Sequence, residues 1–359
     1  MKRLWLFYPE NDIALAHGNS NFTAPAAAVA LHQAGEALPL WMASDGDYVL
    51  CNGINDRWLG EVQTRYGVAA GVWDHRDYAC VPVPWGWSAA SRKVFENCGF
   101  TAGVLPSQKV LDTYRELSHR RTAALFARMI GQELPFVDAR AEEVSDIKAL
   151  SAILADGNPH VVKSPWSSSG RGVHFVIPGR TDEALRQAAG TIRRQGSVMV
   201  EPMVCDRLDF AMLYYMECGR ARYHGLSVFV TDRSTGRYAG NMVAAPDILA
   251  SSLAHRVPSD MLAALDRAVS PVLEKLLGQV YEGPVGIDMM ADADHRIHIA
   301  EINLRYTMGF LSRSLERLVP YGDRYIYEIL PGNGVPDGAI CLTPPSTVMQ
   351  FVLRPLHGY

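Results

Sequence analysis

Two acidic residues and an amide in the last third of the chain have a spacing that could hold a metal ion. They are Asp288, Glu301 and Asn303, in the segment GIDMMADADHRIHIAEINLR. If the tip of a β-hairpin falls at Asp294-His295, the two acids face each other directly and the amide lies on the same face of the sheet. Mg²⁺ typically binds one or two carboxylates together with substrate phosphates. The hairpin therefore predicts magnesium-assisted chemistry on a phosphate-bearing substrate.

Spacing alone leaves a second interpretation of this hairpin open. The acids could belong to a salt-bridged surface strand, paired with Arg296 or Arg305, because like charges placed opposite each other destabilise a sheet unless they are neutralised. In the metal interpretation, Arg305 continues the same row and meets an anion beyond the cation. A register slip of one residue would send Asp288 to the opposite face.

A second candidate is the stretch VVKSPWSSSGRGV, in which an apolar strand ends at Lys163 and a loop of small residues follows. A Walker A loop has its lysine after the glycines, at the start of a helix. Here Lys163 precedes Gly170 and Gly172, and the next element reads as a strand, so the stretch is not a P-loop. Successive backbone N–H groups in such a loop can still surround a phosphate, and a plain flexible turn is the alternative.

Together the two features resemble the ATP-grasp superfamily, which includes D-alanine–D-alanine ligase and biotin carboxylase. The most specific match is GIDMM…AEINLRYTMG, in which an Asp is followed thirteen residues later by Glu and two after that by Asn. The resemblance covers roughly residues 106–320. It implies an α/β then α+β chain with the ATP-grasp fold and an N-terminal Rossmann-like pre-ATP-grasp domain.

The resemblance also implies site residues. Asp288, Glu301 and Asn303 would bind Mg²⁺, for which Mn²⁺ can substitute. Arg305 would meet the acceptor carboxylate or the oxyanion of a tetrahedral intermediate. Gly286 stands where some ligases of the family carry an arginine, so the ligase subclass stays open.

For ATP, the resemblance implies that Lys163 and Arg120 hold the α- and β-phosphates and, with Arg305, act in catalysis. Arg120 stands where the family has a lysine, and arginine keeps the charge and can bind phosphate through two hydrogen bonds. The resemblance also implies a phosphate-covering loop, which contains Ser167, Ser168, Ser169 and Gly170. The strand that holds the adenine edge would contribute Glu201, Pro202, Met203 and Val204. Asp209 would bind the ribose hydroxyls.

Several polar residues are candidates for contacts with the substrates. Asn11 and Asn21 follow the first strand, where loops at strand carboxyl ends line ligand crevices in open α/β sheets; turn-forming asparagine is an equal alternative. Arg222, His224 and Asn241 lie on the segment that faces the second substrate in relatives, and Arg313 could join Arg305. For these four residues, structural roles are the alternatives.

The implied reaction is ligation: ATP converts a carboxylate to an acyl phosphate, an amine attacks it, and ADP and phosphate leave. Closure of the loop at 167–172 would keep water from hydrolysing the acyl phosphate. One alternative is a kinase that stops after phosphoryl transfer. Another is a nucleotide-binding regulator without turnover, against which the complete set of metal-binding residues argues.

The elements that must position these residues follow from the hydrophobic pattern. Residues 3–8, 23–35 and 38–43 predict a strand, a helix and a second strand of a parallel βαβ unit. From Pro106 the periodicity is helical, with Ser107 predicted to cap one helix and Ser118 the next. Antiparallel hairpins are predicted around the serine-rich loop and around residues 217–219. The expected domains are 1–105 (α/β), 106–200 (small lobe) and 201–359 (large lobe).

Composition limits the partners. The chain has 359 residues and a formal net charge of −4, and its sparse basic clusters do not form a polyanion footprint, so no nucleic acid is expected. No run of 18 apolar residues predicts a membrane span. The six scattered cysteines suit reduced thiols in a cytoplasm. The expected partners are small-molecule carboxylate and amine substrates, and a homodimer is the base-rate expectation.

Overall fold

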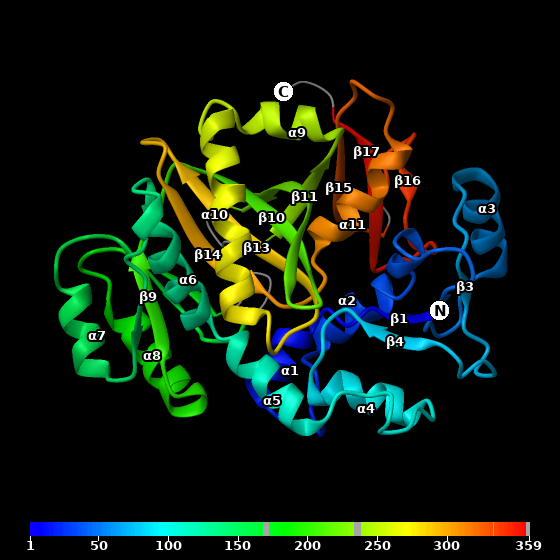
Figure 1. Ribbon diagram of the computed structural model, residues 1–359, viewed down its shortest axis with the longest axis horizontal. Helices are drawn as coiled ribbons and strands as arrows, with labels where there is room; N and C mark the ends of the chain where they lie inside the picture. The colour runs from blue at the N-terminus through cyan, green and yellow to red at the C-terminus, as the bar shows by residue number, and fades with distance from the viewer. Residues whose placement is uncertain (168–171, 233–237, 333, 357–359) are drawn as a thin grey trace.

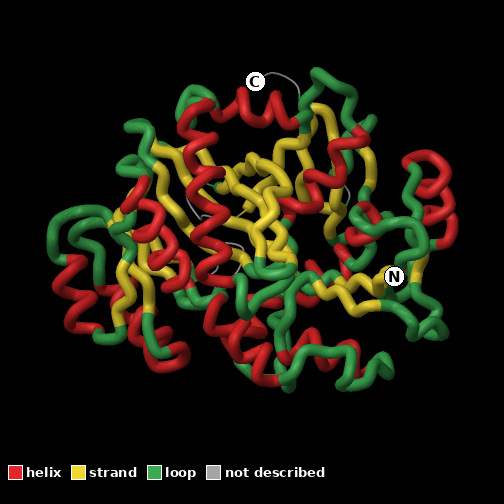
Figure 2. Tube along the Cα trace, in the orientation of Figure 1, coloured by secondary structure: helices red, strands yellow, loops and turns green. Residues whose placement is uncertain are grey.

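The computed structural model describes residues 1–167, 172–232, 238–332 and 334–356. Within these ranges the strands form three sheets, of four, nine and four strands (Figure 1). The nine-stranded sheet lies in the middle, with the N-terminal sheet on one side and the third sheet on the other (Figures 1 and 2). None of the helices in the described ranges combines the length and apolar character needed to cross a lipid bilayer.

The N-terminal sheet is parallel in all its pairings, in the order β3-β2-β1-β4. Its strands are β1 (Arg3–Leu6), β2 (Tyr48–Val49), β3 (Gly71–Val72) and β4 (Val81–Pro84). The helices of this region are α1 (Asn11–His17), α2 (Ala26–Gly35), the 3₁₀ helix η1 (Leu38–Trp41), α3 (Asp56–Tyr66) and α4 (Ala89–Asn97). The predicted first strand and first long helix are confirmed as β1 and α2.

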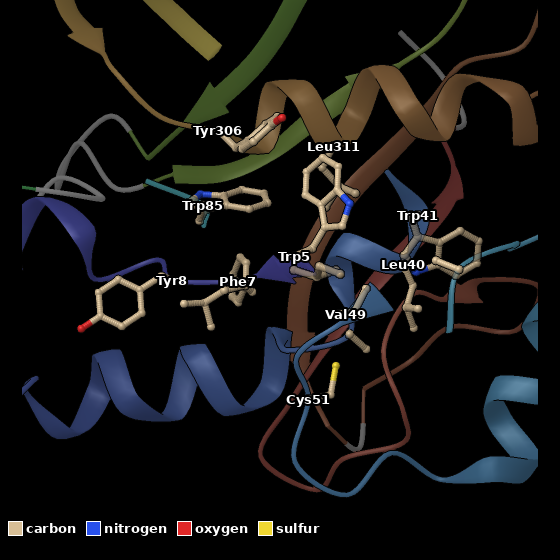
Figure 3. Packing of buried hydrophobic residues seen from close by; sticks show 14 of the residues in the cluster. Trp5, Phe7, Tyr8, Leu40, Trp41, Val49, Cys51, Trp85, Tyr306 and Leu311 are labelled. Carbon is tan, nitrogen blue, oxygen red and sulfur yellow. The ribbon is translucent and has the colours of Figure 1, made fainter. Parts of the chain in front are cut away.

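The strand predicted at 38–43 is wrong. The first four residues of the run LPLWMA form the 3₁₀ helix η1, with Pro39 in its first turn, and the next strand along the chain, which pairs with β1, is β2. The apolar side chains are buried by packing instead of by strand pairing. Trp41 is 3% exposed, and its indole N–H donates to the Leu342 carbonyl at 2.6 Å. Figure 3 shows Trp41 and Leu40 in the same cluster as Trp5 of β1.

A buried carboxylate holds the start of β1. Asp47 is 3% exposed, and it accepts hydrogen bonds from the backbone N–H groups of Arg3 and Ser44, the Trp5 indole and the Arg3 guanidinium at 2.9–3.0 Å. Burial alone would raise the pKa of Asp47, but these hydrogen bonds and the Arg3 charge outweigh it, so the pKa lies below the ordinary value of 3.8.

Asp47→Asn should remove part of the acid sensitivity of the protein. A lowered folded-state pKa contributes stability above the unfolded value, and this contribution is lost as pH falls through the folded value. At pH 7 we expect the variant to lose about 1–3 kcal/mol, because one amide oxygen cannot serve all these donors. Urea unfolding from pH 7 to pH 3 should then show a smaller decline below pH 4 than in wild type. If the free energy of unfolding falls by the same amount below pH 4 in wild type and variant, Asp47 does not have this role.

The third sheet is a small separate layer with the order β6-β9-β7-β8. Its elements are β6 (Glu142–Val144), α7 (Ile147–Leu154), β7 (His160–Lys163), β8 (Val173–Val176), α8 (Asp182–Gln195) and β9 (Val198–Pro202). The predicted hairpin around the serine-rich loop is confirmed, since β7 and β8 pair in antiparallel fashion. Helices α7 and α8 lie together at the outer side of this sheet (Figure 1).

The large sheet has the order β16-β17-β15-β12-β11-β10-β13-β14-β5. Its strands are β5 (Val137–Asp138), β10 (Arg207–Glu217), β11 (Arg220–Thr231), β12 (Tyr238–Val243), β13 (Gly283–Asp292), β14 (Ile297–Asn303), β15 (Tyr325–Pro331), β16 (Ile340–Cys341) and β17 (Met349–Pro355). The antiparallel pair predicted around 217–219 is confirmed as β10 and β11.

Helices cover both faces of the large sheet. They are α6 (Arg120–Glu133), α9 (Pro246–Leu253), α10 (Ser259–Leu277) and α11 (Met308–Leu315). Helix α5 (Gln108–Leu117) precedes α6 along the chain, and the 3₁₀ helix η2 (Glu316–Leu318) follows α11. Alternate residues of β10 serve two cores. Phe210 and Met212 join the cluster under α6, α9 and α10, whereas Ala211 and Leu213 join the cluster shared with α11 and the N-terminal region. A central strand buried on both faces carries such a continuous apolar run.

The segment 106–200 divides in its packing. The third sheet takes residues from Glu142 onward, whereas α6 and β5 pack on the large sheet. The prediction that Ser118 caps the second helix is wrong. Ser118 ends α5, and its hydroxyl donates to the Tyr114 carbonyl at 2.8 Å. His119 caps α6, since its Nδ1 accepts the Arg121 N–H at 3.0 Å. The cap thus lies one residue later, directly before Arg120.

Candidate active site

The β13–β14 hairpin places Asp288 directly opposite Glu301, as the sequence predicts. The predicted two-residue tip is wrong. Asp292 Oδ1 accepts the N–H groups of Asp294 and Arg296, both at 2.9 Å, and His295 has a positive φ of 58°, which gives a longer turn. The register shifts between Asp288 and Met289. This irregularity offsets the longer turn and restores the predicted facing of the two acids.

The Asp288–Glu301 pair is partly buried, and Arg120 pairs with Glu301. Asn303 is 4% exposed, and its Nδ2 donates to Asp288 Oδ2 at 3.0 Å. Burial and the neighbouring Glu301 charge raise the pKa of Asp288 to about 7, even though the Arg305 charge and the Asn303 hydrogen bond act in the opposite direction. A divalent cation bound to these oxygens would remove the repulsion, so the donor set fits Mg²⁺.

A metal ion at the β13–β14 hairpin would need more ligands than its two carboxylates. In the described part of the chain, no three His, Cys, Asp or Glu side chains gather in a way that could hold a metal ion. A cation at the hairpin would therefore need the amide oxygen of Asn303 and oxygen atoms of a bound ligand. Magnesium sites that handle phosphates commonly take several ligands from substrate and water.

The hairpin borders a cavity of about 260 Å³. Its walls come from the third sheet, the large sheet and the first turn of α11, and helix α2 contributes Leu31. Its lining includes Val161 and Phe175, which are cross-strand partners, and Met290; we call these three residues the apolar slot. The lining also includes the neutral polar residues Asn241 and Thr307 and the two acids of the hairpin.

Each arginine or lysine that lines the cavity within the described ranges pairs with a carboxylate. Lys163 of β7 pairs with Glu201 of β9. Arg120 Nη2 donates to Glu301 Oε2 at 2.9 Å, and its Nη1 donates to Ser167 Oγ at 2.6 Å. The remaining pairs are Arg207 with Asp209 at 3.1 Å and Arg305 with Asp12 at 2.7 Å.

The structure brings most of the predicted site residues to this cavity. The predicted residues that line it are Arg120, Lys163, Glu201, Pro202, Val204, Asp209, Asn241, Asp288, Glu301, Asn303 and Arg305. Ser167 is buried beside Arg120. Ser168, Ser169 and Gly170 lie outside the described residues.

Other predicted residues lie away from the cavity wall. Met203 donates its backbone N–H to the Pro159 carbonyl at 3.0 Å. Asn21 is exposed on the surface. Asn11 is 1% exposed and does not line the cavity, and its side-chain oxygen has no partner within the described residues.

Arg222, His224 and Arg313 also lie outside the cavity lining. Arg222 is mostly exposed and pairs with Glu217 at 3.2 Å. The His224 ring stacks on Phe310 at 5.3 Å between centroids. Arg313 pairs with Glu316 at 2.5 Å. These contacts are the structural roles that the sequence left as alternatives.

Two charged residues of the site were not predicted. Asp12 binds Arg305 through both carboxylate oxygens, and Arg207 binds Asp209. The signal for Asp12 was weak: it adjoins Asn11 in the turn after the first strand, where ligand contacts were expected. For Arg207, the only hint in the sequence is that Asp209 follows two residues later in the same strand, where side chains two apart share a face.

Comparisons with known proteins concern the fold. No protein-family model matches the chain, and no curated protein matches it in sequence. A solved N5-carboxyaminoimidazole synthetase of Staphylococcus aureus, complexed with ADP, aligns over 100% of this chain and 95% of its own, with 10% identity and a TM-score of 0.53.

Two further solved structures give the same result. An N5-carboxyaminoimidazole ribonucleotide synthetase in an ADP complex aligns over 99% of this chain and 93% of its own, with 14% identity and a TM-score of 0.54. A biotin carboxylase of Campylobacter jejuni aligns over 99% of this chain and 88% of its own, with 11% identity and a TM-score of 0.54. The chain therefore has the ATP-grasp fold, and the predicted fold class is confirmed.

Proposed function

We propose that this chain is an ATP-dependent ligase that activates a carboxylate as an acyl phosphate and joins it to an amine, releasing ADP and phosphate. The observation that carries the proposal is the facing Asp288–Glu301 pair with Asn303, in a cavity that Lys163 and Arg120 also line. The structural neighbours named above support it, since the S. aureus synthetase is complexed with ADP.

The nucleotide would lie along the cavity with its base in the apolar slot. Val161, Phe175 and Met290 suit a flat heteroaromatic ring, and the backbone of Glu201, Pro202 and Val204, which also line the cavity, would supply polar groups at its edge. Asp209 would accept hydrogen bonds from the ribose hydroxyls. This places the phosphates toward Lys163, Arg120 and the β13–β14 hairpin.

The ion pairs in the cavity suggest an exchange of partners when nucleotide binds. Phosphate oxygens would replace Glu201 as the partner of Lys163, and Glu301 as the partner of Arg120. Glu301 would then be free, with Asp288 and Asn303, to hold Mg²⁺, which neutralises charge on the β- and γ-phosphates. Phosphoryl transfer needs mainly such positioning and charge neutralisation from the protein.

The acceptor would bind beyond the γ-phosphate, near Arg305. A carboxylate oxygen attacks the γ-phosphorus, ADP leaves, and the resulting acyl phosphate is attacked at carbon by the amine. Arg305 would stabilise the oxyanion that forms in this second step. The neutral wall of Asn241, Ser227 and Thr307 would hold the rest of the acceptor.

The proposal is tested by ADP release from Mg·ATP in the presence of pooled amino acids, dipeptides and small organic acids. Joint stimulation by one acid and one amine is the expected result. Stimulation by a single compound, with a stable phosphorylated product, would replace the ligase by a kinase. Nucleotide binding without stimulated turnover in any pool would contradict the ligase proposal.

Asp209→Asn should raise the KM for ATP about 10-fold and leave kcat nearly unchanged. Hydrogen bonds to a charged acceptor contribute about 1.5–3 kcal/mol, and ribose contacts are the same in the ground and transition states, so their loss affects KM. The matched control is 2′,3′-dideoxy-ATP, with which wild type and variant should behave alike. A KM difference that persists with this analogue would mean that Asp209 acts through Arg207 and Thr231, which it binds at 3.1 and 2.5 Å.

A further inference from the structure

We infer that Asp12, in the N-terminal region, is a positioning residue that orients Arg305 toward the reacting groups. The inference rests on the proposed ligase function and extends it. It makes the N-terminal region part of the active site, although the phosphate- and metal-binding candidates all lie after residue 119.

The contact fixes one edge of the Arg305 guanidinium. Arg305 Nε lies 3.0 Å from both carboxylate oxygens of Asp12, and Nη2 lies 2.7 Å from Oδ2. The side chains of Arg305 and Asp12 are only 15% and 12% exposed. A fork of this kind fixes the plane and the direction of the group, which a single hydrogen bond would not do.

The remaining donors of Arg305 point to its use. A guanidinium has five N–H groups. Asp12 accepts the single N–H of Nε and one N–H of Nη2. The Tyr306 carbonyl accepts one N–H of Nη1 at 3.1 Å. One N–H on each terminal nitrogen therefore has no protein acceptor among the described residues. Because Arg305 lines the cavity, these two donors are available to substrate oxygens.

A backbone hydrogen bond, an aromatic cluster and a close glycine contact surround the pair. The Tyr306 N–H donates to the Trp85 carbonyl at 2.7 Å, which joins the chain after β14 to the end of β4. The Tyr306 ring lies 5.9 Å from Trp85 and 5.2 Å from Trp5 between centroids, and Figure 3 shows these three rings in one cluster. A Cβ on Gly86 would lie 2.8 Å from the Arg305 Cβ, so only glycine permits this approach.

A purely structural ion pair is the competing explanation. Such a pair would hold the N-terminal region against the large sheet without affecting the chemistry. The two explanations differ in which kinetic constant depends on Asp12. A positioning role affects the step at Arg305, since a displacement of about 1 Å can cost about 100-fold in rate. A structural role affects folding and nucleotide binding together.

The test compares Asp12→Asn, Arg305→Lys and the double variant with wild type. We expect Asp12→Asn to lower kcat about 100-fold and to leave the KM for Mg·ATP within about threefold. The effects of the two substitutions should not multiply, because both act through the same guanidinium. Asp138→Asn is the matched control: Asp138 is a buried acid held by Arg140 at 2.5–3.1 Å outside the cavity. It should lower the melting temperature and leave kcat unchanged.

A second readout does not depend on turnover. The ¹⁵N–¹H resonance of Arg305 Nε, assigned by its absence in Arg305→Lys, should exchange slowly with solvent in wild type and rapidly in Asp12→Asn. Multiplicative kcat effects, a KM for Mg·ATP that rises in parallel with lost stability, or an unchanged Nε resonance would overturn the inference. If wild type shows no stimulated turnover, the proposed function fails, and the resonance alone still decides whether Asp12 orients Arg305.

Discussion

Asp288→Asn should reduce acid- and amine-stimulated ADP release by about 1,000-fold or more while leaving the free protein as stable as wild type, or more stable. Loss of a single charge-stabilising group commonly costs 100- to 1,000-fold, and here a metal ligand is lost as well. The stability expectation follows from the cost of charging Asp288 in the folded protein, since its burial and the neighbouring Glu301 charge raise its pKa to about 7.

The sign of the pH effect is opposite to that of Asp47. A carboxyl group whose folded-state pKa is raised contributes stability below its unfolded value, and this is lost as pH rises through the folded value. Without metal, wild type should therefore lose stability between about pH 4 and pH 7 through Asp288. The asparagine variant should lack this loss, which urea unfolding in EDTA would measure.

Ligand binding supplies the matching readout for Asp288. Mg·ATP should raise the melting temperature of wild type, because a ligand that binds only the folded state stabilises it, and this shift should be much smaller in Asp288→Asn. The control Asp138→Asn should behave in the opposite way, with lower stability, full turnover and a normal shift. A variant at Asp288 that is unstable but fully active would show that the pair is a structural feature only.

Lys163→Met should lower kcat/KM for ATP by about 100- to 1,000-fold, because a fixed cation in a desolvated site stabilises the charge that develops during phosphoryl transfer. The variant should also be less stable by about 1–3 kcal/mol, since Glu201, whose side chain is only 13% exposed, loses its partner. Steady-state kinetics and urea unfolding measure the two effects separately.

The double variant Lys163→Met/Glu201→Gln separates the two roles of the lysine. It removes both charges of the pair, so stability should return toward that of wild type. Turnover should stay low, because the phosphate-binding cation is still missing. If turnover recovers together with stability, Lys163 only balances Glu201, and the phosphate must be held by other groups.

The sequence predicted the central feature of the site because that feature is local. Asp288 and Glu301 are thirteen residues apart in one hairpin, and strand geometry alone brings them together. The predicted tip was nevertheless wrong. The longer turn at Asp292 and the register irregularity after Asp288 have compensating effects, and alternation along the strands does not predict such irregularities.

What could not be predicted depends on contacts far apart in the chain. Asp12 and Arg305 are 293 residues apart, and no local pattern pairs them. The strand predicted at 38–43 failed for a similar reason, because Trp41 donates to Leu342, 301 residues away. An apolar run shows that a segment is buried, but its partner decides whether it is strand or helix.

Transfer of ¹⁸O from the acid to phosphate is the most direct test of the ligase mechanism. The acid identified by the pooled screen, labelled with ¹⁸O in both carboxylate oxygens, would be incubated with Mg·ATP, the amine and the protein. An acyl phosphate requires one carboxylate oxygen to leave with phosphorus when the amine attacks, so we predict one ¹⁸O in the released phosphate for each bond formed. Formation of the amide with unlabelled phosphate would contradict the acyl phosphate mechanism.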